Sequence, residues 1–193
     1  MANSAVDLTS FCGIATVLLS TPIVIINSPF GATTKTRALI DPGAEVSFIS
    51  ESLVQRLKLG RSSVSIPIIG VGNCKMMTKG STIIIVSSRI NKIYSNTIET
   101  YILQKLTSYT PKCVKSKESW PHLNNLPLTD PNFASNTLIE LIIGVHLFSL
   151  IIQEKIVRGP AGAPLGRKTS LGWILVCSSS TIHSSCPLTV QIA

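Results

Sequence analysis

The chain has 193 residues, of which 45% are hydrophobic and 13% are charged. This composition excludes an intrinsically disordered chain, which needs low hydrophobicity and a high density of charge. The length indicates one domain of ordinary size with short extensions at most. Since 17 Lys and Arg stand against 9 Asp and Glu, the net charge of +8 requires that an acidic partner such as nucleic acid be considered.

The N-terminal part of the chain is apolar and carries no charged residue between Asp7 and Lys35. It does not read as a secretory signal, because no basic residue precedes it, or as a membrane span, because Pro22 interrupts it. Its β-branched residues instead predict two buried strands, at residues 15–19 and 23–26.

A strand–turn–strand unit is the next predicted feature. Residues 33–40 and 46–50 have strand character, and the connection between them contains Asp41, Pro42 and Gly43. A short helix is expected at residues 51–57, because apolar residues recur there at helical spacing after Ser50, a suitable N-cap.

The middle of the chain predicts a hairpin and a long loop. Residues 66–71 and 81–87 are expected to pair across bends that contain glycines. One or two further strands are expected at residues 90–103, and the polar, proline-containing residues 107–136 are expected to form a loop.

The C-terminal part alternates short apolar runs with breaks. It predicts a strand at residues 138–143, a short helix at 146–152, a turn at 159–164 and a final strand at 171–176. Many short strands with one or two short helices indicate a mostly β, closed barrel.

The five cysteines are odd in number and widely spaced, so they predict reduced thiols and an intracellular, cytoplasmic setting rather than a disulfide framework. Cys177, His183 and Cys186 form a loose cluster without an evident fourth ligand. No metal and no cofactor are therefore expected.

Asp41 is the candidate for chemistry, because the only other aspartates are Asp7 and Asp130. An Asp in a glycine-bearing turn between apolar strands is typical of aspartic peptidases, in which two carboxylates share a proton across an attacking water. Neither of the other aspartates lies in such a turn. The second carboxylate would therefore come from another copy of the chain, in a two-fold dimer.

Residues 38–49, ALIDPGAEVSFI, resemble the active-site strand and turn of retropepsins, and most of all the aspartic peptidase domain of BEL/Pao-type retrotransposon polyproteins. Further stretches agree with that family in the same order along the chain: VLLST at 17–21, IGVG at 69–72, LIIG at 141–144, and IVRG at 156–159 through LGWIL at 171–175. The resemblance covers about residues 14–177, between an N-terminal extension of residues 1–13 and a C-terminal tail of residues 178–193.

This resemblance implies a retropepsin-like barrel and an aspartic endopeptidase that acts as a homodimer on an extended peptide, such as its parent polyprotein. It makes Asp41 the catalytic carboxylate and places Ile142 and Ile143 beneath its loop. The substrate-binding residues that it implies are those of the loop and of a flap over the substrate: Gly43, Ala44, Glu45, Ile69, Gly70, Val71 and Gly72.

The chain departs from the family at Pro42, where Ser or Thr is expected. In related peptidases that residue cross-braces the two active-site loops of the dimer, whereas proline has neither a hydroxyl nor an N–H. The alternative function is therefore a decayed or domesticated domain that dimerises or binds peptide without hydrolysis. Glu140 and His146 also depart from the family pattern, and His146 is expected to be a surface residue.

A third alternative is a basic nucleic-acid-binding module. Few aromatic residues are interleaved with the mid-chain lysines and arginines, so the basic residues are expected to be a solvated surface and nucleic acid is not an expected partner.

Overall fold

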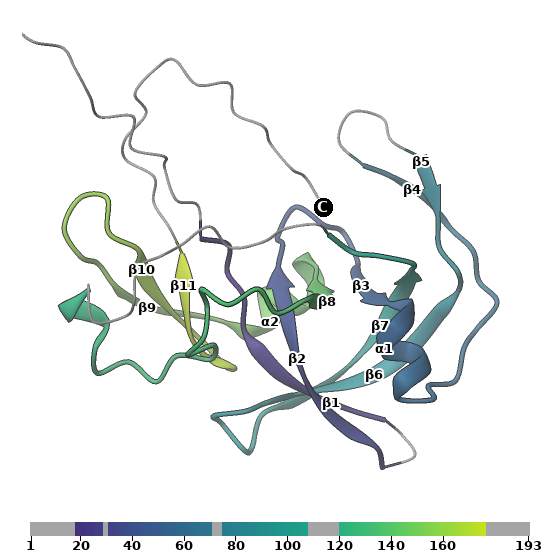
Figure 1. Ribbon diagram of the computed structural model, residues 1–193, viewed down its shortest axis with the longest axis horizontal. Helices are drawn as coiled ribbons and strands as arrows, with labels where there is room; N and C mark the ends of the chain where they lie inside the picture. The colour runs from purple at the N-terminus through teal and green to yellow at the C-terminus, as the bar shows by residue number, and fades with distance from the viewer. Residues whose placement is uncertain (1–17, 29–30, 71–74, 108–119, 177–193) are drawn as a thin grey trace, which may run out of the picture.

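The computed structural model describes residues 18–28, 31–70, 75–107 and 120–176. These residues form a mostly β structure with a closed six-stranded barrel and two short helices, which confirms the predicted fold class. Figure 1 shows a three-stranded sheet beside the barrel and a two-stranded hairpin that projects from it. In the described part of the chain, no helix is long and apolar enough to span a membrane.

The barrel has the strand order β1-β2-β8-β3-β7-β6. Its strands are β1 (Ile23–Asn27), β2 (Thr33–Ile40), β3 (Ser47–Ser50), β6 (Ser81–Ser88), β7 (Ser95–Leu103) and β8 (Ile139–Ile143). β8 lies between β2 and β3, parallel to the first and antiparallel to the second. The two strands that flank the Asp41 loop are thus separated by a strand from far along the sequence.

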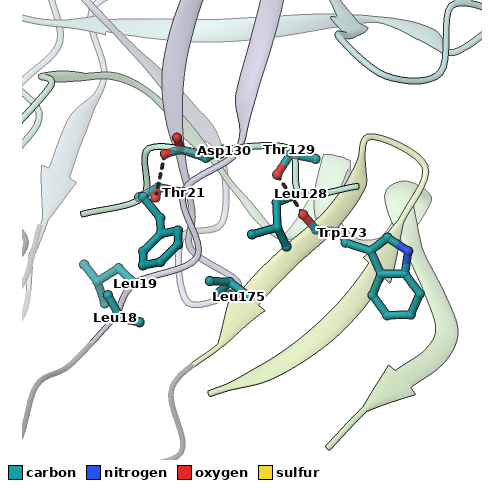
Figure 2. A pocket seen from close by; sticks show the side chains of 9 residues that line it. Leu18, Leu19, Thr21, Leu128, Thr129, Asp130, Trp173 and Leu175 are labelled. Carbon is teal, nitrogen blue, oxygen red and sulfur yellow. Dashed lines mark hydrogen bonds between the residues drawn. The ribbon is translucent and has the colours of Figure 1, made fainter. Parts of the chain in front are cut away.

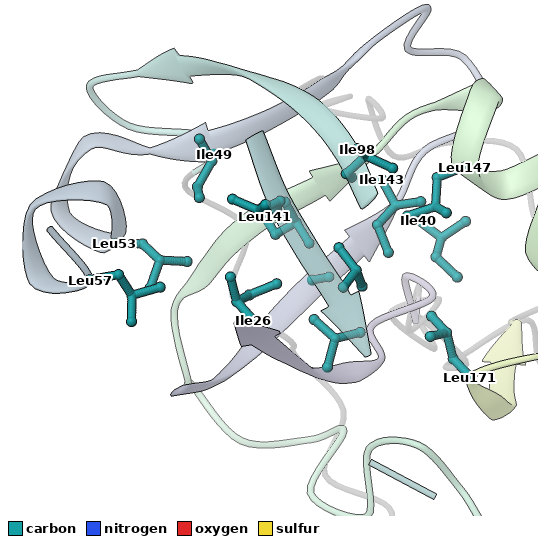
Figure 3. Packing of buried hydrophobic residues seen from close by; sticks show 14 of the residues in the cluster. Ile26, Ile40, Ile49, Leu53, Leu57, Ile98, Leu141, Ile143, Leu147 and Leu171 are labelled. Atoms are coloured by element: carbon teal, nitrogen blue, oxygen red, sulfur yellow. The ribbon is translucent and has the colours of Figure 1, made fainter. Parts of the chain in front are cut away.

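The barrel core explains why these segments are apolar (Figure 3). Ile40, Ile49 and Leu141 are buried in the same cluster, which also contains Leu53 of helix α1 (Glu51–Arg56) and Leu147 of helix α2 (Val145–Ile151). α1 begins where the sequence predicts, because the Ser50 hydroxyl accepts a hydrogen bond of 3.2 Å from the Leu53 N–H.

A second cluster covers the opposite face of the same strands. Leu39, Phe48 and Ile142 are buried there together with Leu103 and Leu106, which follow along β7 and its C-terminal extension. β8 is therefore buried on both faces, which accounts for its nearly continuous apolar sequence, Ile-Glu-Leu-Ile-Ile.

The predicted pairing of residues 66–71 with 81–87 is wrong. β4 (Pro67–Ile69) pairs instead with β5 (Lys75–Met77), and β6 belongs to the barrel, where it pairs with β1 and β7. β6 buries Ile84 and Val86 in the barrel core, and both of its edges are taken by barrel strands, so β4 pairs with the adjacent β5 instead.

The three-stranded sheet consists of β9 (Ile152–Val157), β10 (Leu165–Thr169) and β11 (Gly172–Val176), of which the sequence predicts only the last. β9 is largely exposed, and its apolar residues Ile152, Ile156 and Val157 lie at its two ends without the alternation that marks a strand. Residues 18 and 19 are not in a strand, contrary to expectation, and residues 15–17 lie outside the described residues.

The segment predicted as a long loop is ordered around its own apolar cluster over residues 120–136. It contains a 3₁₀ turn, Pro121–Leu123, and buries Trp120, Leu123 and Phe133 against Leu175 of β11. Residues 108–119 lie outside the described part.

Candidate active site

Asp41 lies in the connection between β2 and β3, at one end of the barrel. Pro42, Gly43 and Glu45 are exposed, while Asp41 and Ala44 are partly buried. The connection is a tight turn, because the Ala44 N–H donates to the Asp41 carbonyl over 3.1 Å. The sequence prediction of an acidic residue in a turn between two core strands is confirmed.

Backbone hydrogen bonds join this turn to the end of β8 and to the start of α2. The Asp41 N–H donates to the Ile143 carbonyl over 3.0 Å, and the Val145 N–H donates to the Ala44 carbonyl over 2.8 Å. Ala44 and Val46 also pack against the apolar cluster that contains Ile142. The predicted packing of Ile142 and Ile143 against the Asp41 loop is therefore confirmed.

Gly144, the N-cap residue of α2, lies close to the backbone of the loop. A Cβ atom there would lie 2.4 Å from the Val46 carbonyl oxygen and 2.9 Å from the Ala44 carbonyl oxygen. The Gly144 N–H donates to the buried Ser47 hydroxyl over 3.1 Å. Sequence reasoning missed Ser47, because a serine at the start of a short strand carries no signal that its hydroxyl will meet a distant glycine.

The Asp41 carboxylate is oriented by its own turn. Its Oδ1 accepts a hydrogen bond of 3.0 Å from the Gly43 N–H. The ion pairs of the described residues engage Glu51, Asp130 and Glu140, not Asp41. The turn therefore presents a carboxylate at the molecular surface without a neutralising cation from the described residues.

The β4–β5 hairpin corresponds to the predicted flap. Its Ile68 packs against the apolar cluster of Leu39, Phe48 and Ile142, and Ala44 and Val46 of the Asp41 loop pack against the same cluster. Ile69 is 65% exposed, and Gly70 is partly buried. Val71 and Gly72, the other two predicted flap residues, lie outside the described residues.

His146 is exposed on α2, as expected of a surface residue. The loose cluster of Cys177, His183 and Cys186 lies outside the described residues. Among the residues that the structure describes, no group of three or more His, Cys, Asp or Glu side chains is placed to hold a metal ion.

Glu140 links β8 to helix α1 and to strand β2. It accepts hydrogen bonds from both terminal nitrogens of Arg56 on α1, at 3.1 and 2.6 Å, and from the hydroxyls of Ser52 and Thr36 at 3.1 and 3.2 Å. Burial acts to raise the pKa of Glu140, but the hydrogen bonds and charge of Arg56, together with the hydrogen bonds from Ser52 and Thr36, hold the pKa below its ordinary value of 4.5. The Glu140 network therefore stabilises the folded chain only while Glu140 is ionised.

We expect Glu140→Gln to lower the free energy of unfolding by about 1 kcal/mol at neutral pH, a modest value because Arg56 is half-exposed. A carboxyl with a lowered pKa stabilises the fold above its unfolded pKa, and this contribution is lost as the pH falls through the folded pKa. Urea unfolding of both proteins should therefore show a difference at pH 7 that shrinks below the ordinary pKa of 4.5. Glu154→Gln, at an exposed position of β9, is the matched control. A difference that persists unchanged at low pH would contradict the prediction.

No family model matches the sequence, and no curated protein matches it either.

Proposed function

We propose that this chain is a retropepsin-like aspartic endopeptidase, derived from a retrotransposon polyprotein and active as a homodimer. The observation that carries the proposal is the position of Asp41. It lies in a solvent-facing turn between two core strands, and backbone hydrogen bonds to Ile143 and Val145 hold this turn. The resemblance of residues 38–49 to the retropepsin active-site strand supports the same assignment.

In the proposed mechanism, Asp41 of each protomer contributes one carboxylate. Because two nearby carboxylates do not both ionise, one is charged and the other keeps a proton. The charged carboxylate takes a proton from a bound water, whose oxygen attacks the peptide carbonyl carbon. The protonated carboxylate donates to the carbonyl oxygen. Collapse of the tetrahedral intermediate breaks the C–N bond, and a proton passes to the departing amine.

The remaining parts of the site would bind an extended peptide. The β4–β5 hairpin would close over the substrate and exclude water. Gly43 would allow the peptide and the second loop to approach closely, because it has no side chain. A Cβ atom at this position would lie 3.2 Å from the Asp41 Oδ1 and would crowd the carboxylate. Ala44 and Glu45 would lie beside the substrate backbone.

Pro42 favours a second candidate function, a peptidase-fold domain that dimerises or binds peptide without hydrolysis. It is exposed at the tip of the turn and supplies neither an N–H nor a hydroxyl for a brace between two loops. The two functions differ in one measurable property, the cleavage of a peptide bond.

The test is digestion of a peptide library by the purified chain near pH 5, with and without an inhibitor of aspartic peptidases. We expect cleavage that rises more steeply than linearly with protein concentration, because the active species is a dimer. Asp41→Asn should lower the rate by about three orders of magnitude or more. Glu154→Gln, which changes an exposed carboxylate on β9, should retain cleavage. Absence of cleavage by the wild-type chain, at concentrations where it is dimeric, would favour the second candidate.

A further inference from the structure

Arg37 is a buried charged residue on the strand that leads to Asp41. It lies on β2 with only 1% of its side chain exposed, and its terminal Nη2 is 2.9 Å from Oδ2 of Asp130, which is 3% exposed. Figure 2 shows Asp130 also joined to the hydroxyl of Thr21. Burial raises the pKa of Asp130, and the charge of Arg37 acts in the opposite direction.

Most of the contacts of Arg37 are made to the backbone that enters β8. Its guanidinium donates to the Ser135 carbonyl at 2.6 Å, to the Asn132 carbonyl at 2.7 Å and to the Thr137 carbonyl at 3.4 Å, and also to the Ser135 hydroxyl at 2.8 Å. These residues have no regular secondary structure and end two residues before Ile139, the first residue of β8. A planar, five-donor side chain suits this task, because it reaches several acceptors in one fixed arrangement.

The pairing of β2 with β8 is irregular beside Arg37. Arg37 is opposite Ile139, but the next residue, Ala38, is opposite Leu141, so Glu140 is an extra residue on β8. Such a bulge changes the register of a strand locally. The register of β8 against β2 is therefore not fixed at the start of β8 by the hydrogen bonds between the two strands alone. Contacts outside these hydrogen bonds must specify it.

The C-terminal end of β8 does not allow a shift of its register. A shift by one residue would bring Ile143 or Val145 to the place of Gly144, where a Cβ would lie 2.4 Å from the Val46 carbonyl oxygen. It would also exchange the two faces of β8, which are both apolar but are shaped by different neighbours. Ile143 and Val145 meet the Asp41 loop correctly only if β8 begins at the correct residue.

We propose that Arg37 is a positioning residue, which fixes the start of β8 beside β2 and thereby holds the Asp41 loop in its conformation. The effect of Arg37 on catalysis rests on the proposed function, whereas its effect on the conformation of the Asp41 loop does not.

Arg89 provides a matched comparison. It lies in the connection between β6 and β7 and donates to the Leu128 carbonyl at 3.0 Å and to the Thr129 carbonyl at 3.2 Å. It thus holds the same segment as Arg37, but upstream of Asp130 and without contact to the residues that enter β8.

The test measures amide hydrogen exchange by NMR in the full chain. The amides of Asp41 and Val145 report on the loop, and the amide of Ile102, bonded to the Gly80 carbonyl, reports on the barrel. In Arg37→Lys, which keeps the charge beside Asp130 but not the fork of donors, we expect the loop amides to exchange about tenfold faster or more, with Ile102 unchanged. Arg89→Met should leave the amides of Asp41 and Val145 unchanged.

Arg37→Met alone would leave Asp130 buried without its cation and is expected to destabilise the whole fold. The double variant Arg37→Met with Asp130→Leu removes both charges, and we expect it to fold and to show the same loop-specific acceleration. Unchanged protection of the loop amides in the folded lysine or double variant, or equal acceleration in Arg89→Met, would overturn the proposal.

Peptide cleavage separates this inference from the proposed function. If the chain is a peptidase, both Arg37 variants should lower kcat about tenfold or more with little change in KM, because the loop is misplaced rather than the substrate lost. If the wild-type chain cleaves nothing, the proposed function fails, while the exchange measurement still decides the role of Arg37.

Discussion

Gly144→Ala is expected to destabilise the chain by about 3 kcal/mol or more, although it adds a single methyl group. Gly144 has φ −76° and ψ −179°, a conformation that alanine adopts without strain. The cost is therefore steric. The added Cβ would lie 2.4 Å from the carbonyl oxygen of Val46 and 2.6 Å from its carbonyl carbon. These are backbone atoms of the connection at residues 41–46, which cannot rotate away as a side chain would.

Relief of this clash requires α2 to move away from the loop. Such a movement would stretch the hydrogen bonds from Val145 to Ala44 and from Gly144 to Ser47. Thermal and urea unfolding measure the effect, and Gly60→Ala is the matched control, because a Cβ at Gly60 has no heavy atom within 4 Å. Equal stabilities of Gly144→Ala and Gly60→Ala would show that the loop is not held against α2 as described.

Pro42→Ser is expected to strengthen the proposed dimer and to raise its peptidase activity. Serine restores an N–H and a hydroxyl at the exposed tip of each turn, where proline has neither. If each restored hydrogen bond contributes about 1 kcal/mol, two bonds per dimer tighten association by about tenfold to thirtyfold. Cleavage at limiting concentration should rise with the dimer population.

Sedimentation velocity and cleavage rates over a concentration series measure both effects. Asp41→Asn is the inactive control, and Pro160→Ser, at an exposed proline between β9 and β10, controls for the general effect of replacing proline. A wild-type chain that is already fully dimeric and as active as Pro42→Ser would show that the brace is dispensable. A Pro42→Ser dimer that cleaves no peptide would count against the peptidase proposal.

Local sequence patterns predict the elements that present the candidate site. β1, β2, β8 and the two helices lie close to their predicted bounds, because each combines a short apolar pattern with a clear break. The Asp41 turn follows from the same local chemistry, since Asp, Pro and Gly disfavour continuation of a strand. Ser50 identifies the start of α1 because a hydroxyl cap acts over only three residues.

The sequence by itself therefore determines a mostly β chain in which one aspartate lies in a turn between buried strands. Only the tertiary structure decides which strands pair, because backbone hydrogen bonds do not depend on side-chain identity. β4 thus pairs with β5, and β9 and β10 join a sheet that no alternating apolar pattern predicts. The tertiary structure also decides that Arg37, which lies in a polar stretch of sequence, is buried. The partners that allow its burial, Asp130 and the carbonyls that follow it, are brought beside β2 by the pairing with β8.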